Sequence, residues 1–127
     1  MARALSTTKQ VSFLYDFAVD GGLVSTIQMG VFIPNNAIIY YGVAKVTTAL
    51  TSGGAATIAV GYTGGTGDLI AALAVASWSA DAVIEGVDLP GASVEATANR
   101  QLAVTIATAA LTAGVFVYTV LYIELDS

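Results

Sequence analysis

Gln101–Ile123, with the sequence QLAVTIATAALTAGVFVYTVLYI, is the stretch that decides the fold. Two runs rich in Val, Ile and Thr flank the small residues Ala-Leu-Thr-Ala-Gly, and such runs suit a pleated, half-buried surface. A near copy, AKVTTALTSGGAATIAVGY, occupies Ala44–Tyr62. Glycine just after each turn supplies the positive φ that a tight turn requires. Both stretches are therefore predicted to be β-hairpins, around which the remaining strands complete a sandwich.

Alternating apolar residues predict further strands along the chain. The clearest runs are Val11–Val19, Leu23–Ile33 and Ala37–Thr48, in which apolar side chains recur at every second position. Together with Ala92–Ala98 and the strands of the two hairpins, they make about eight strands at the spacing that is typical of sandwiches and jelly rolls. We therefore predict an all-β fold, a two-sheet antiparallel β-sandwich of jelly-roll type.

One segment is compatible with a helix. In Asp68–Trp78 (DLIAALAVASW) the apolar residues fall at helical spacing, and Ala and Leu are strong helix formers. This segment is predicted to be a short helical turn or an irregular crossover, with a strand over 72–78 as the alternative. Residues 1–10 are small and polar and are predicted to form an N-terminal arm. Residues 11–127 then form a single β-sandwich domain.

Charge is scarce throughout the sequence. Charged residues make up 10% of the 127 residues and the net charge is −5, whereas roughly 25% is usual for soluble domains. The cations are Arg3, Lys9, Lys45 and Arg100. We therefore expect neither a nucleic acid nor a membrane as a partner, because nucleic acids and anionic membranes attract basic surfaces. Two stretches of more than twenty residues, 46–67 and 101–123, contain no charged residue and are long enough for membrane helices. Their frequent Thr and Gly favour paired strands instead.

The residues that most catalytic sites require are missing. The chain contains no His and no Cys, which removes the commonest general base and the thiol nucleophile. Asp81, Glu85 and Glu95 are candidates for a carboxylate pair, but they lie in predicted loops or at strand edges. Asp81, Glu85 and Asp88 do not have the spacing of a calcium-binding EF-hand loop. We therefore expect no enzyme activity, no metal and no cofactor.

Two other features have a structural and a functional interpretation. The glycine-rich stretch Gly61–Gly67 (GYTGGTG) lacks the Lys of a phosphate-binding loop and the spacing of a dinucleotide-binding loop. It is therefore predicted to be a surface loop. Trp78, the only Trp, is predicted either to fill the core or to anchor an interface.

Two strands carry large apolar side chains on both faces. In the last strand, Val115, Val117, Leu121 and Ile123 are expected to face the core, and the aromatic residues between them to face outward. With so few charges to cover the surface, we expect these outward faces to be buried against other subunits, where aromatic residues are enriched. The candidate oligomer interface consists of Ile38, Tyr40, Tyr41, Phe116, Tyr118 and Tyr122.

The runs Val46–Val60 and Leu102–Gly114 resemble small proteins encoded near the major capsid gene of tailed bacteriophages. Those proteins have a similar pair of Ala/Thr/Gly-rich turns, an Ala/Leu-rich middle and a last strand that ends in aromatic residues. The resemblance covers about residues 38–122. It implies a head decoration (capsid cement) protein, a homotrimer on the outer surface of the capsid that ties major capsid protein subunits together. Arg3 and Lys9 of the arm would then contact the capsid.

Two alternatives remain open. A tail or fibre component of the same virion would have the same kind of sequence. A jelly-roll carbohydrate-binding module would use Trp78 and the Gly61–Gly67 loop to hold a sugar. The expected location in the first two cases is the virion.

Overall fold

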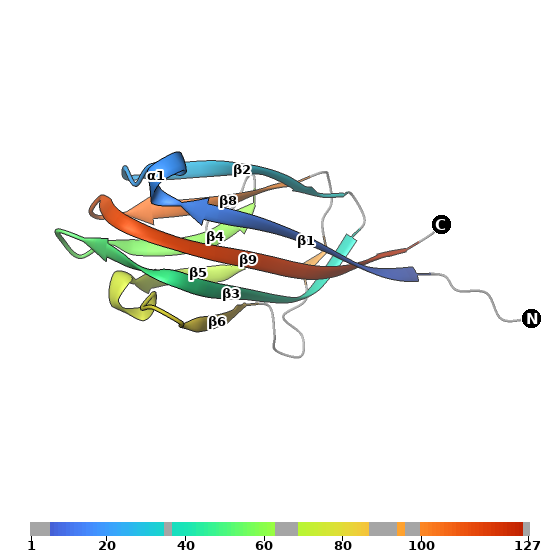
Figure 1. The fold of residues 1–127 in the computed structure, drawn as a ribbon. Coiled ribbons are helices and arrows are strands. Elements are labelled where there is room, and N and C mark those ends of the chain that lie inside the picture. Colours follow the sequence, from blue (N-terminus) through green and yellow to red (C-terminus); the bar gives the residue numbers. More distant parts are fainter. Residues whose placement is uncertain (1–5, 35–36, 63–68, 87–93, 96–99, 126–127) are drawn as a thin grey trace, which may run out of the picture.

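The computed structural model in Figure 1 contains two antiparallel sheets that pack face to face. The structure describes residues 6–34, 37–62, 69–86, 94–95 and 100–125. The five-stranded sheet has the order β1 (Ser6–Asp16), β9 (Leu111–Leu125), β3 (Ala37–Ser52) and β6 (Val83–Gly86), with β7 (Val94–Glu95) also paired to β3. The four-stranded sheet has the order β2 (Ser25–Ile33), β8 (Arg100–Ala107), β4 (Thr57–Tyr62) and β5 (Ile70–Ala74). The predicted all-β sandwich of jelly-roll type is thereby confirmed.

The two stretches predicted to be hairpins are instead arches that connect the sheets. β3 lies in the five-stranded sheet and β4 in the four-stranded sheet, and the same holds for β9 and β8. The prediction was wrong because a hairpin and an arch have the same local pattern, two alternating strands around small turn residues. The two arches lie against each other, since β9 pairs with β3 and β8 pairs with β4. Their similarity in sequence therefore corresponds to adjacent, equivalent positions in the fold.

The turns of the two arches interlock at one end of the sandwich. The Thr51 and Thr112 hydroxyls lie 2.7 Å apart, and the Ser52 hydroxyl donates to the Ala110 carbonyl at 2.7 Å. Gly114 has φ +141, and a Cβ there would lie 2.6 Å from Leu50 Cγ. A positive φ was predicted for the glycines after both turns. Gly114 of the second turn has one, whereas Gly53 and Gly54 of the first turn do not.

The face of β9 that points into the core is opposite to the predicted one. Phe116, Tyr118, Val120 and Tyr122 are buried, whereas Val115, Val117, Leu121 and Ile123 are half-buried on the outside. Inside, the Phe116 ring centroid lies 4.8 Å from that of Trp78 and 5.3 Å from that of Tyr15. Both faces alternate equally well, so periodicity alone does not choose between them. The larger area of the aromatic rings favours their burial.

Trp78 was predicted either to fill the core or to anchor an interface. Its side chain is fully buried, so it fills the core. The helical turn predicted for the segment before it is found only at the end of that segment. Residues Ile70–Ala74 form strand β5, and a single turn of 3-10 helix, η1 (Val75–Ser77), follows. β5 pairs with β4 from Thr57↔Ala74 to Val60↔Ile70. Pairing to an existing sheet edge thus overrides the helix propensity of Ala and Leu.

The first strand also differs from the prediction at both ends. β1 begins at Ser6, so half of the predicted arm pairs with β9, from Ser6↔Leu125 onward. β1 ends at Asp16, because the Asp16 side chain accepts a hydrogen bond from Ala18 N and starts α1 (Phe17–Asp20). None of the helices in the described ranges is long and apolar enough to cross a membrane.

Candidate interaction surface

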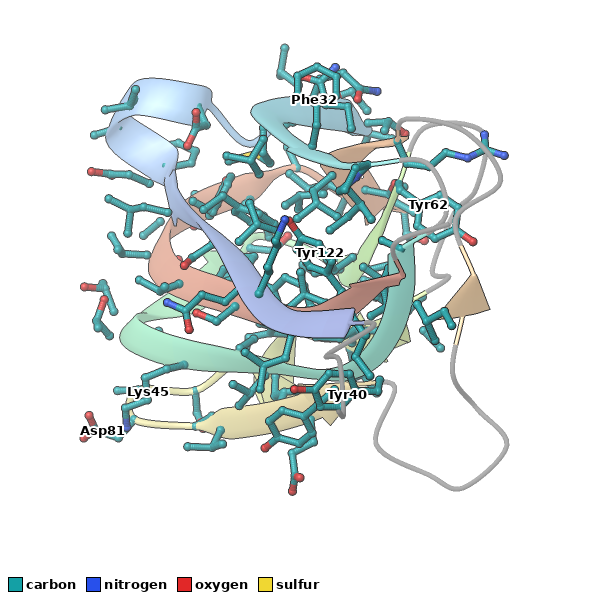
Figure 2. All side chains as sticks on the ribbon, turned by 90° about the vertical axis from the view of Figure 1, so that its right-hand side faces the viewer. Phe32, Tyr40, Lys45, Tyr62, Asp81 and Tyr122 are labelled. Atoms are coloured by element: carbon teal, nitrogen blue, oxygen red, sulfur yellow. The ribbon has the colours of Figure 1, made fainter. Side chains whose placement is uncertain are left out.

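Three of the six predicted interface residues lie inside the single chain. Phe116 and Tyr118 are fully buried and Tyr122 is 8% exposed, and in Figure 2 Tyr122 lies between the two sheets. Their assignment to an outer face was therefore wrong, for the reason given above. Ile38, Tyr40 and Tyr41 are half-buried, and the Tyr41 hydroxyl donates to Glu85 Oε2 at 3.3 Å.

The outer face of the five-stranded sheet is nevertheless rich in apolar side chains. Leu14 lies opposite Val117, and Ile38 lies opposite Ile123. Leu121 lies between Gln10 and Tyr41. We call this surface the apolar outer face. It consists of Leu14, Ile38, Tyr41, Val43, Val83, Val117, Leu121 and Ile123.

Charges on this side of the molecule lie on β3 and at the β6 edge, and Lys45 lies opposite both Val117 and Val83. Lys45 Nζ donates to the Asp81 carbonyl at 3.0 Å and lies 3.8 Å from Asp81 Oδ1. Figure 2 shows this pair pointing away from the core, on the opposite side of the sheet from Tyr122. Glu85 lies next to Tyr41 on the same edge. Along the middle of the face the polar residues are Thr119 of β9 and, beside β9 on β1, Gln10 opposite Leu121 and Ser12 opposite Thr119.

The outer face of the four-stranded sheet has a different chemistry. Its central positions hold small residues and threonines, with Thr26 Oγ1 3.2 Å from Thr105 Oγ1 and Ala59 opposite Thr105 on the other side. Hydroxyl groups and small side chains expose little apolar area, so this face is suited to water. The two outer faces of the sandwich thus differ, and the five-stranded sheet presents the one that resembles an interface.

Those of the remaining predicted residues that the structure describes are not gathered into a site. Lys9 is exposed on β1 opposite Tyr122. Arg3, Asp88 and most of the Gly61–Gly67 loop lie outside the described residues. Within the ranges that the structure describes, no three acidic side chains lie close enough to hold a metal ion, and no pocket for a small molecule is found.

The shifted ionisable groups are tyrosines of the core. Burial, and then the nearby carboxylates of Asp20 and Asp16, raise the pKa of Tyr15 to about 12. Burial also raises the pKa of Tyr118. Both shifts move the pKa of the hydroxyl further above pH 7, so each phenol stays protonated. Neither hydroxyl is therefore suited to act as a general base near pH 7.

No protein-family model matches the sequence, and no curated protein matches it. Solved structures do match the fold. A chain of the acidic stable capsid of Helicobacter pylori bacteriophage KHP30 has a TM-score of 0.70 at 15% identity, over 97% of this chain and 92% of that one. A chain of the Ralstonia phage GP4 capsid has a TM-score of 0.66 at 19% identity, over 100% and 90%.

A chain of the cyanophage Pam1 capsid asymmetric unit gives a TM-score of 0.73 at 17% identity, over 98% of this chain and 89% of that chain. All three structures are of capsids, and none is of an enzyme. The described sandwich is thus a fold that also occurs, over nearly its whole length, among the chains of bacteriophage capsids.

Proposed function

We propose that this chain is a structural protein of a bacteriophage virion, a decoration or cement protein on the outer surface of the capsid. Three observations support the proposal: the fold occurs in phage capsids, the sequence resembles that of decoration proteins, and one sheet has an apolar outer face. A shell protein needs surfaces for neighbours rather than a catalytic centre. The absence of His and Cys from the sequence agrees with that role.

The apolar outer face is the observation that carries the proposal. In the proposed assembly three copies bury this face against one another around a threefold axis, with Leu121 and Val117 near the centre of each contact. On β9 the proposed interface uses Val117, Leu121 and Ile123 in place of the aromatic residues. On β3 it uses Ile38 and Tyr41 of the apolar outer face, with Tyr40 next to them. Stable interfaces bury about 1,600 Å² in total. The trimer would then stabilise contacts between major capsid protein subunits through repeated attachment.

Arg3 and Lys9 remain the proposed contacts to the capsid near the N-terminal end of β1. A tail or fibre component would share the fold and the apolar face. Imaging of whole particles by cryo-electron microscopy distinguishes the two locations. The carbohydrate-binding alternative is less favoured, because Trp78 is fully buried and cannot stack on a sugar.

The association is tested by sedimentation equilibrium of the purified chain at micromolar concentration. We expect a trimer for the wild type and a monomer for Leu121→Lys, because a buried, unpaired ammonium group costs several kcal/mol. The matched control is Thr105→Lys, at the centre of the other outer face, which should remain trimeric. A monomeric wild type, or dissociation by Thr105→Lys but not by Leu121→Lys, would contradict the proposed interface.

A further inference from the structure

The segment Asp16–Ser25, at the end of the sandwich where the arches turn, is held rigidly by hydrogen bonds. We call it the α1 tip (Figure 1). Asp16 N donates to Asp20 Oδ2 at 2.9 Å, while Asp16 Oδ1 accepts from Ala18 N at 3.0 Å. The Tyr15 hydroxyl donates to the Gly21 carbonyl at 2.5 Å, and Gly21 N donates to the Phe17 carbonyl at 2.9 Å.

Packing against β9 fixes the second half of the tip. Leu111 N donates to the Gly22 carbonyl at 2.7 Å. A Cβ at Gly22 would lie 2.7 Å from Phe17 Cε1 and 2.8 Å from Leu111 Cβ, so only glycine fits there. The Ser25 hydroxyl donates to the Leu23 carbonyl at 3.0 Å. The backbone of the tip is therefore bonded to its surroundings from Asp16 to Gly22, and the Leu23 carbonyl is bonded to Ser25.

This rigid segment nevertheless presents large apolar side chains to solvent. Val19 is 79% exposed, Leu23 is 76% exposed and Val24 is 54% exposed. Single exposed aliphatic residues are ordinary, but three within six positions form a cluster. Because the backbone is already ordered, burying these side chains in a partner costs little conformational entropy. A protruding, preorganised apolar knob has the properties of an interface anchor.

We infer that the α1 tip docks into an apolar groove with a basic rim on a capsid shell subunit, a protein different from this chain. This inference rests on the proposed function. The tip has two carboxylates, Asp16 and Asp20, and the sequence from 16 to 25 contains no Lys or Arg. Two tips that met would bring like charges together, which disfavours a second copy as the occupant. The described residues of this chain also offer no pocket to receive a knob.

The position of the tip makes each copy a bridge with two attachment points. Lys9 and Asp16 lie toward opposite ends of β1, and the seven residue steps from one Cα atom to the other span about 24 Å at 3.4 Å per step. Lys9 would contact one shell subunit by charge, and the tip would contact a neighbouring subunit by apolar burial. A sandwich attached at both ends resists separation of the two subunits that it joins.

The experiment uses particles of the phage that encodes the chain, stripped of the native protein and mixed with purified variants. The double variant Val19→Ser with Leu23→Ser should bind at least 10-fold more weakly than the wild type, because two buried aliphatic contacts are lost. The matched control is Phe32→Ser, which removes an apolar side chain that is 55% exposed on β2, away from the tip. It should bind like the wild type. Asp20→Asn keeps an oxygen for Asp16 N, and should weaken binding about 2- to 5-fold and reduce its dependence on salt.

A photo-cross-linking amino acid at position 23 identifies the occupant, with the same group at position 32 as the control. A cross-link from position 23 to the major capsid protein supports the inference. A cross-link to a second copy of the chain, or to no protein while the variants still bind the particle normally, overturns the inference and leaves the proposed function standing. Failure of the wild-type chain to bind particles at all overturns both.

Discussion

Gly114→Ala tests whether the two arches lock together as described. Gly114 lies in β9 beside Leu50 of β3, at the point where one arch passes the other. The new methyl group would lie 2.6 Å from Leu50 Cγ, 2.7 Å from Leu50 Cδ1 and 2.9 Å from Leu50 Cα. The φ of +141 is also one that side chains other than that of glycine rarely allow.

The expected loss of stability has two sources. Forcing a methyl group into a packed site costs about 1–3 kcal/mol, and holding alanine at an unfavourable backbone angle costs about 1–3 kcal/mol more. The total of about 2–6 kcal/mol is a large part of the 5–15 kcal/mol by which a typical domain is stable. With an m-value of about 2 kcal/mol per M, the urea midpoint should fall by about 1–3 M.

Urea unfolding followed by the fluorescence of Trp78 measures this change, because the fully buried indole becomes exposed on unfolding. All variants are compared at one protein concentration, since association would shift the midpoint. The control is Gly53→Ala, at a position in the first arch turn with no atom within 4 Å of the added Cβ. That substitution should be neutral or stabilise the fold by up to about 1 kcal/mol.

A second variant separates the steric clash from the backbone strain. Leu50→Ala alone should cost about 2–5 kcal/mol. Combined with Gly114→Ala it should cost less than the sum of the two, because Leu50 Cγ and Cδ1 are two of the three nearest atoms. Equal midpoints for Gly114→Ala and Gly53→Ala would refute the interlocked arches.

Three further predictions concern hydrogen bonds and protons. Tyr15→Phe loses the hydrogen bond to Gly21 and should lower the free energy of unfolding by about 1 kcal/mol in a urea titration. The buried Tyr118 hydroxyl has no hydrogen-bond partner among the described residues, so Tyr118→Phe should leave the free energy of unfolding unchanged or raise it. Because burial raises the pKa of Tyr15 from 10.0 to about 12 and that of Tyr118 as well, the folded state keeps protons that the unfolded chain releases. Stability should be full below pH 10 and fall above it, and a constant urea midpoint from pH 9 to about pH 12 would contradict this. Asp16→Ala should cost about 0.5–2 kcal/mol through the lost bond to Ala18 N, whereas Asp16→Asn, which keeps the oxygen, should cost less; equal thermal midpoints for the two would count against the cap.

Much of the strand content follows from local periodicity. Ile58 and Val60 in β4, and Leu102, Val104 and Ile106 in β8, point into the core as their alternation predicts. Alternation is a property of each strand by itself, so it is visible without knowledge of the partners. Among the described strands, β5 and β6 were not predicted as strands. In β5 four of the five residues are Ala or Leu, and the helical spacing of its apolar residues is a coincidence of composition.

The candidate surface could be predicted only in part. The scarcity of charge and the two-sided apolar strands indicated an interface on the strands that became β3 and β9, and an apolar outer face is found there. The choice of face was wrong because Val and Leu on one side and Phe and Tyr on the other alternate equally. The α1 tip was missed, because Val19 and Leu23 were assigned to strands and their exposure depends on the turn at Asp16.

The amino-acid sequence by itself determined that this chain is a β-sandwich with few charges, without histidine or cysteine, and with more apolar surface than one core can bury. Only the tertiary structure decided which side of β9 faces inward, that the two repeated stretches cross between sheets, and where the exposed apolar residues gather. Strand pairing joins residues far apart in the chain, such as Ala37 with Glu124, and its energy depends on packing that no local pattern contains.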